Sequence, residues 1–71
     1  MHLSMLINTI KVRRETLNVS QEGLAQLSGV SLRTIKQIES GKGNPTLSTI
    51  ELLADVLGME LKLVIKKPDT K

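Results

Sequence analysis

Apolar residues recur three or four positions apart through most of this 71-residue chain. That spacing places them on one face of a helix, because a helix turns once in about 3.6 residues. Four stretches have this spacing, at residues 4–17, 21–28, 32–40 and 47–57. The pattern predicts a mainly α protein whose inward-facing residues are Leu3, Leu6, Ile7, Ile10, Leu17, Leu24, Ala25, Leu27, Ile35, Ile38, Leu47, Ile50, Leu53, Ala54 and Leu57.

Residues that typically start and end helices flank these stretches. A Ser or Thr side chain accepts a hydrogen bond from a first-turn N–H group, and Gly or Asn adopts the left-handed conformation that ends a helix. The expected N-caps are Ser4, Ser20, Ser31 and Thr46, and the expected helix ends are Asn18, Gly29, Gly41 and Gly58. Gly23 departs from the pattern, because glycine inside a helix costs about 1 kcal/mol relative to alanine and nothing in the sequence explains it.

The segment MELKLVIKK changes its period from that of a helix to that of a strand. Apolar and more polar residues alternate, which predicts a half-buried strand over residues 60–66. A continued helix is the alternative, because Leu61, Val64 and Ile65 also fit helical spacing. The apolar residues of the strand face are Met59, Leu61, Leu63 and Ile65.

A lone strand leaves its backbone donors and acceptors unpaired, and the sequence contains no second strand pattern. We therefore expect this strand to pair with the same strand of a second copy. The chain then divides into a helical domain over residues 4–58, a dimerisation strand over residues 59–67 and a flexible tail over residues 68–71.

Composition excludes several kinds of site. The chain has no Cys and a single His, His2, so it offers neither thiolate ligands nor a set of imidazoles for a metal. The same absences, with no visible acid–base constellation, argue against an enzyme. We expect neither a metal nor a cofactor. A domain this small without disulfides is commonly stabilised by oligomerisation.

Charge and aromatic content favour duplex nucleic acid as a partner. Ten Lys or Arg residues against seven Asp or Glu residues give a net charge of +3, which suits a polyanion. Phe, Tyr and Trp are absent, and proteins that bind single strands commonly stack bases on these rings. No stretch approaches the roughly 20 apolar residues of a membrane span, and the N-terminus lacks a secretory signal. We expect a cytoplasmic protein without membrane contact.

Residues 21–40 have the pattern of two short helices that cross steeply over a tight turn. Ala25 is small where the second helix must approach closely, and Gly29 can supply the positive φ of the turn. The apolar residues expected to fill the angle between the helices are Val30, Ile35 and Ile38.

The spacing SQ..LA...GVS...I..IE.GK, with its flanks from about Ile7 to Met59, resembles the Cro and lambda-repressor-like helix-turn-helix family, also called the XRE family. The resemblance implies a lambda-repressor-like fold of four helices, with the third in the major groove of DNA and the second across the phosphate backbone. It also implies a salt bridge between Arg14 and Glu39 that ties the first helix to the third.

Carried over by position, the resemblance assigns contacts with DNA bases to Leu32, Arg33, Lys36 and Gln37. It assigns contacts with phosphates to Ser20, Gln21, Ser31, Lys42, Gly43 and Asn44. Arg33 can donate two hydrogen bonds to guanine, and Gln37 can pair with adenine. Leu32 replaces a residue that is often polar, and it can meet only a thymine methyl or a sugar. Without the motif, this face would be interpreted as an ordinary solvated helix surface.

The C-terminal strand is similar to that of HipB-like antitoxins, which dimerise through such a sheet. The main hypothesis is therefore a homodimeric, sequence-specific duplex DNA-binding repressor of bacterial or phage origin, associated with the nucleoid. It would occupy an inverted repeat, since two reading helices about 34 Å apart meet successive major grooves. The alternative is a HipB-like antitoxin that neutralises a HipA-like kinase toxin and regulates its own operon.

Overall fold

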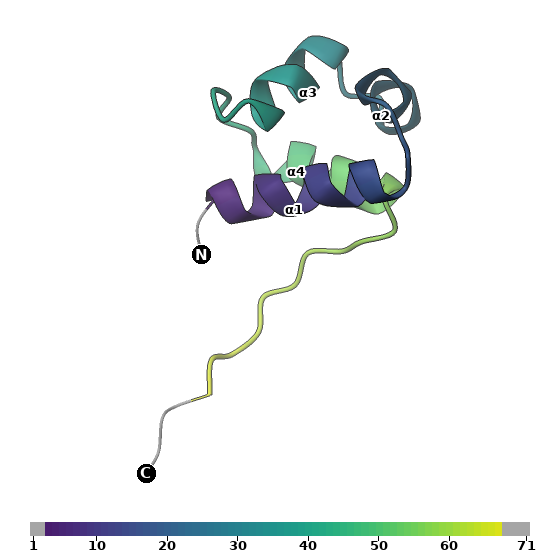
Figure 1. Ribbon diagram of the computed structural model, residues 1–71. Coiled ribbons are helices and arrows are strands. Elements are labelled where there is room, and N and C mark those ends of the chain that lie inside the picture. The colour runs from purple at the N-terminus through teal and green to yellow at the C-terminus, as the bar shows by residue number, and fades with distance from the viewer. Residues whose placement is uncertain (1–2, 68–71) are drawn as a thin grey trace.

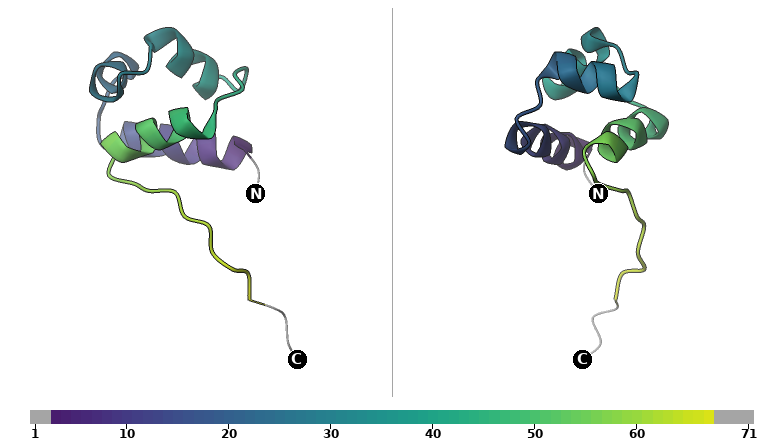
Figure 2. Two further views of the ribbon diagram at one scale, coloured as in Figure 1. Left: turned by 180° about the vertical axis from the view of Figure 1, so that it is seen from behind. Right: turned by 90° about the vertical axis from the view of Figure 1, so that its right-hand side faces the viewer.

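The computed structural model describes residues 3–67, and this part of the chain folds into four helices. Their bounds are α1 Leu3–Thr16, α2 Gln21–Ser28, α3 Leu32–Glu39 and α4 Leu47–Val56. Helices α1 and α4 lie side by side in one layer, and α2 and α3 lie across them in a second layer (Figures 1 and 2). The prediction of a four-helix, lambda-repressor-like domain is confirmed, with each helix within one residue of its expected bounds.

One apolar core joins all four helices. Leu24 of α2, Ile35 and Ile38 of α3 and Leu53 of α4 are almost completely buried at its centre. Among the described residues, the buried apolar residues are Ile7, Ile10, Leu24, Ile35, Ile38, Ile50, Leu53, Ala54 and Leu57. Burial of this common face holds short helices together that would not be stable alone in water.

Four leucines expected to face inward are exposed, which corrects the prediction from spacing. Leu3 and Leu17 lie at the two ends of α1, beyond the reach of the core. Leu27 lies on the flank of α2, because Leu24 and its neighbours already occupy the inward face of that helix. Leu47 lies at the first position of α4, outside the buried stripe that begins with Ile50.

Three of the four expected N-caps form the predicted hydrogen bonds. Ser20 Oγ accepts from the N–H group of Gly23 at 2.9 Å, and Ser31 Oγ accepts from that of Thr34 at 3.1 Å. Thr46 Oγ1 caps α4 in the same way, accepting from Thr49 N–H at 3.1 Å. Ser4 is the exception, because α1 already includes Leu3 and Ser4 therefore lies within the helix. The expected helix ends Asn18, Gly29, Gly41 and Gly58 all have positive φ.

The capped end of α2 gives Gly23 a structural explanation that the sequence did not provide. A Cβ atom at this position would lie 3.2 Å from Ser20 Oγ and 3.4 Å from Val19 Cγ1. Glycine therefore lets the capping hydroxyl and the preceding valine pack closely against the first turn.

The segment after α4 forms neither the predicted strand nor a continued helix in the single chain. Gly58, with a φ of 75°, follows α4, residues 59–61 still lie against the helices, and the end of the segment runs away from them (Figure 1). Met59 and Leu61 pack against the core, whereas Leu63 and Ile65 are 92% and 95% exposed. The helical alternative is therefore wrong. Pairing of residues 60–66 between two copies stays a prediction, because a single chain supplies no neighbouring strand.

His2 and the expected tail over residues 68–71 lie outside the described residues. Among residues 3–67, no helix combines the length and the apolar character needed to cross a bilayer.

Candidate nucleic-acid interface

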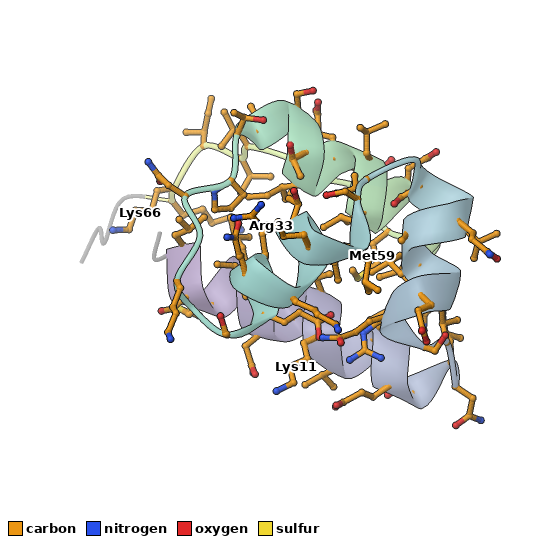
Figure 3. The ribbon with its side chains drawn as sticks, turned by 90° about the horizontal axis from the view of Figure 1, so that it is seen from above. Lys11, Arg33, Met59 and Lys66 are labelled. Atoms are coloured by element: carbon orange, nitrogen blue, oxygen red, sulfur yellow. The ribbon has the colours of Figure 1, made fainter. Side chains whose placement is uncertain are left out.

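Helix α3 has a buried face and an exposed polar face. Ile35 and Ile38 are buried, and at about 100° per residue Arg33, Lys36 and Gln37 lie on the opposite side of the helix. All three of these side chains are exposed, and Figure 3 looks down onto α3 with Arg33 labelled. The three side chains therefore project from a helix whose orientation the core holds.

The turn between α2 and α3 is held by hydrogen bonds that sequence reasoning missed. Ser28 Oγ donates to the carbonyl of Leu24 at 2.7 Å and accepts from the N–H group of Val30 at 3.1 Å. Gly29 adopts a φ of 79° and donates its N–H group to the carbonyl of Ala25 at 2.9 Å. These bonds hold the last turn of α2 to the residue that leads into α3.

A sheltered ion pair joins α1 to the end of α3. Arg14 Nε donates to Glu39 Oε2 at 2.8 Å, and Arg14 Nη2 donates to Glu39 Oε1 at 2.9 Å. Arg14 Nη1 donates to the carbonyl of Val19 at 2.7 Å, in the connection between α1 and α2. The guanidinium group thus holds the carboxylate in a two-bond geometry and also orders the connection that leads into α2.

The surroundings of Glu39 keep its carboxylate ionised. Its side chain is only 5% exposed, and this burial by itself raises the pKa of Glu39. Hydrogen bonds from Arg14 and Gln21, with the charges of Arg14 and Lys11, outweigh burial and hold that pKa below its usual value. In turn, the hydrogen bond to Glu39 is the main reason that the pKa of Arg14 is raised.

Gln21 has a structural partner that its proposed phosphate contact did not anticipate. Its amide Nε2 donates to Glu39 Oε1 at 2.9 Å, so the first residue of α2 is tied to the last residue of α3. The motif singles out both residues, but the spacing of 18 positions does not reveal that they meet. An amide nitrogen carries two hydrogens, so Gln21 keeps one donor for a second acceptor.

The first turns of α2 and α3 each contain N–H groups without an acceptor inside the helix, as helix geometry requires. In α2 these belong to Gln21 and Glu22, beside the exposed cap Ser20. At α3, the hydroxyl of Ser31 donates to Thr34 Oγ1 at 2.9 Å. Ser20 therefore keeps a hydroxyl hydrogen to donate outward, whereas that of Ser31 is already engaged.

The loop after α3 folds back onto the end of that helix. The N–H groups of Lys42 and Gly43 both donate to the carbonyl of Gln37, at 3.0 and 3.1 Å. A Cβ atom on Gly43 would lie 3.4 Å from the backbone nitrogen of Ile38, so this glycine allows the close approach. Because the single N–H donor of Gly43 is engaged, the outward donors of the loop are the exposed side chains of Lys42 and Asn44.

Residues 3–67 bring together no group of three His, Asp or Glu side chains that could hold a metal. The polar groups exposed near α3 are ammonium, guanidinium, amide and hydroxyl donors. Such groups suit phosphates and base edges rather than a cation.

Comparison with known proteins finds that residues 10–64 match the family model described as helix-turn-helix. An uncharacterized HTH-type transcriptional regulator of Methanocaldococcus jannaschii is 38% identical over 55 residues, covering 78% of this chain and 83% of that protein. Control protein C.SmaI of Serratia marcescens is 31% identical over 67 residues, covering 94% of this chain and 80% of that protein. The cryptic phage CTXphi transcriptional repressor RstR of Vibrio cholerae is 35% identical over 49 residues, covering 69% of this chain but only 44% of the repressor.

Proposed function

The chain belongs to the helix-turn-helix family of DNA-binding transcriptional regulators, and on that premise we propose that it reads a specific duplex sequence with α3. One observation carries the proposal. Arg33, Lys36 and Gln37 are exposed on a helix whose opposite face is buried and whose last residue is held by Arg14 and Gln21. Long donors on a held helix can meet base edges in a defined register, which a mobile helix would not allow.

Each residue on this face has its own chemistry for bases. Arg33 donates two hydrogen bonds to the O6 and N7 atoms of guanine, and Gln37 pairs with the N6 and N7 atoms of adenine. Lys36 reaches either a base or a phosphate. Leu32, half-buried at the start of α3, contributes an apolar contact with a thymine methyl or a sugar.

Phosphates on the two sides of the groove bind to different elements. At the start of α2, the hydroxyl of Ser20, the second amide hydrogen of Gln21 and the first-turn N–H groups face one strand. On the other side, the Lys42 ammonium and the Asn44 amide bind the opposite backbone. The N–H group of Gly43 and the hydroxyl of Ser31, the cap of α3, are engaged within the chain, so we assign these two residues a positioning role rather than a direct bond to a phosphate.

A two-fold homodimer matches an operator whose two half-sites form an inverted repeat. Residues 60–66 of two copies pair as antiparallel strands, which satisfies the backbone groups that the single chain leaves unpaired. The two copies of α3 then meet successive major grooves of an inverted repeat about 34 Å apart. Repression follows from occupying a promoter, and one of the relatives bears the name of a transcriptional repressor.

Selection of bound duplexes from a random pool tests this proposal directly. We expect the wild-type chain to enrich one inverted repeat, with half-sites centred about 10 base pairs apart. A parallel selection from random single strands is the control and should enrich nothing. Recovery of random duplexes, or preferred binding of single strands, would contradict the proposal.

The antitoxin alternative rests on the alternating C-terminal segment. It adds a HipA-like kinase toxin as a second partner to the same DNA-binding dimer. This alternative requires a gene for a HipA-like kinase next to the gene for this chain. Co-expression of the two proteins tests it, because an antitoxin should co-purify with the kinase and suppress its toxicity. A stand-alone repressor should do neither.

A further inference from the structure

Helix α4 exposes apolar and acidic residues side by side, in the layer of the fold opposite α3 (Figure 2). Leu47 is 64% exposed and Leu52 is 49% exposed, and the exposed carboxylates Glu51 and Asp55 lie between them around the helix. We call these four residues the α4 surface. The α4 surface therefore offers two apolar contacts and two negative charges to a partner of matching chemistry.

Two grooves extend this surface toward neighbouring elements. One is lined by Glu51, Leu52 and Asp55 together with residues 59–61. The other is lined by Leu47 and Glu51, by Leu6 of α1 and by residues 61–63. The chain's own C-terminal segment therefore forms a wall of both grooves before it leaves the helices.

The end of the same segment carries the complementary chemistry. Leu63, Val64 and Ile65 are exposed and apolar, and they are followed by the exposed cations Lys66 and Lys67. In the single chain Leu63 borders the groove beside Leu47 but stays 92% exposed, and the residues after it run away from the helices, so the segment leaves the chain's own α4 surface largely uncovered (Figures 1 and 2). A second copy offers the same segment and the same surface, and a two-fold dimer makes both contacts at once.

We propose that the α4 surface binds residues 63–67 of a second copy, with Leu63 and Ile65 against Leu47 and Leu52 and the lysines beside Glu51 and Asp55. The inference rests on the proposed homodimer and names the surface that receives its exchanged segment. The side chains of Lys66 and Lys67 are long enough to bend from the strand toward Glu51 and Asp55. The attraction between these lysines and carboxylates acts over about one Debye length, and it guides the segment toward its apolar contact.

The apolar half of the proposal is tested with two leucines of similar exposure. Leu47→Gln changes the α4 surface, and Leu27→Gln is the matched control, because Leu27 lies on α2 and is 61% exposed compared with 64% for Leu47. We expect sedimentation equilibrium without DNA to show a dimer dissociation constant about tenfold higher for Leu47→Gln. Leu27→Gln should dimerise as the wild type does.

The charged half is tested by exchanging the charges between two chains. One chain carries Glu51→Lys and Asp55→Lys, and the other carries Lys66→Glu and Lys67→Glu. Each variant alone places like charges together and should dimerise more weakly than the wild type. An equimolar mixture restores opposite charges at both contacts, so we expect heterodimers to outnumber homodimers several-fold at low salt and less so at high salt.

The proposal would be overturned if the two charge variants form heterodimers and homodimers in random proportions and Leu47→Gln has the same dimer dissociation constant as Leu27→Gln. A wild-type chain that remains monomeric would overturn it as well. Neither result bears on base reading, because these measurements contain no DNA and leave Arg33 and Gln37 unchanged.

Discussion

At the scale of single residues, one carboxylate joins three helices. Glu39 at the end of α3 accepts hydrogen bonds from Arg14 of α1 and Gln21 of α2. The resemblance to a known family implied the Arg14–Glu39 pair, because the Arg and Glu at the matching positions of that family form a salt bridge. The contact from Gln21 could not be predicted in the same way, because it depends on the angle between α2 and α3.

Neutralising Glu39 should cost stability before it affects DNA binding. Glu39→Gln leaves the buried guanidinium of Arg14 with only the exposed carboxylate of Glu15, 3.9 Å away, as a counter-charge. Breaking one partner of a buried pair typically costs about 3 kcal/mol or more. Urea denaturation followed by circular dichroism measures the loss. Glu22→Gln, at an exposed position of α2, is the control and should change stability by less than about 0.5 kcal/mol. Equal stability of both variants would show that the pair does not hold the fold.

The same residue predicts how stability depends on pH. The pKa of Glu39 is lower in the folded chain than in the unfolded chain, so the pair stabilises the fold above the usual glutamate pKa of 4.5. That stabilisation is lost as pH falls through the folded-state pKa, because the folded carboxylate then gains a proton. Urea midpoints at a series of pH values below about 6 should fall more steeply for the wild type than for Glu39→Gln. If the urea midpoints of both proteins fall equally with pH, carboxylates other than Glu39 cause the loss of stability in acid.

At the scale of elements, local sequence signals predicted the bounds of the helices well but predicted tertiary contacts poorly. Cap residues and periodicity placed α2 at its observed bounds, since both act within a few residues. Periodicity did not show that Leu27 and Leu47 lie outside the buried stripe, because spacing alone does not say where the core ends. The bond from Arg13 Nε to the carbonyl of Leu57, 3.0 Å long, joins residues 44 positions apart and has no local signal.

The turn between α2 and α3 should depend on its glycine for conformational reasons. A Cβ atom on Gly29 would meet nothing within 4 Å, so only its φ of 79° opposes a substitution. We expect Gly29→Ala to lower the free energy of unfolding by about 1 to 2 kcal/mol. Gly29→Asn should lose less, because asparagine tolerates the left-handed conformation better. Thermal or urea denaturation of the two variants checks this order, and an alanine variant as stable as the wild type would contradict it.

At the scale of the whole molecule, the sequence indicated a partner that a single chain cannot display. The alternating segment gave the expectation of a strand, yet in the single chain residues 60–67 form no strand. Strand formation there depends on a second chain, whereas the four helices depend on contacts within one chain. The single chain therefore confirms the predicted helices, whereas the dimer strand stays a proposal.

The two faces of the proposed strand should respond differently to a charge. Leu63→Lys places an ammonium group on the face that packs onto helices, and we expect light scattering to show monomers and operator binding to weaken at least tenfold. Val64→Lys is the matched control on the opposite face and should remain dimeric. Circular dichroism should report unchanged helix content in both variants. Equal behaviour of the two variants would contradict the strand.

Base preference of α3 variants tests the central claim most directly. Selection from a random duplex pool should show that Arg33→Ala loses its preference at one base pair of each half-site and Gln37→Ala at another. Each loss should amount to about 1 to 3 kcal/mol, while preference at the remaining positions persists. Gln26→Ala, at an exposed position of α2, should select the wild-type sequence. If Arg33→Ala and Gln37→Ala both keep the wild-type preference at every position, α3 does not read the operator.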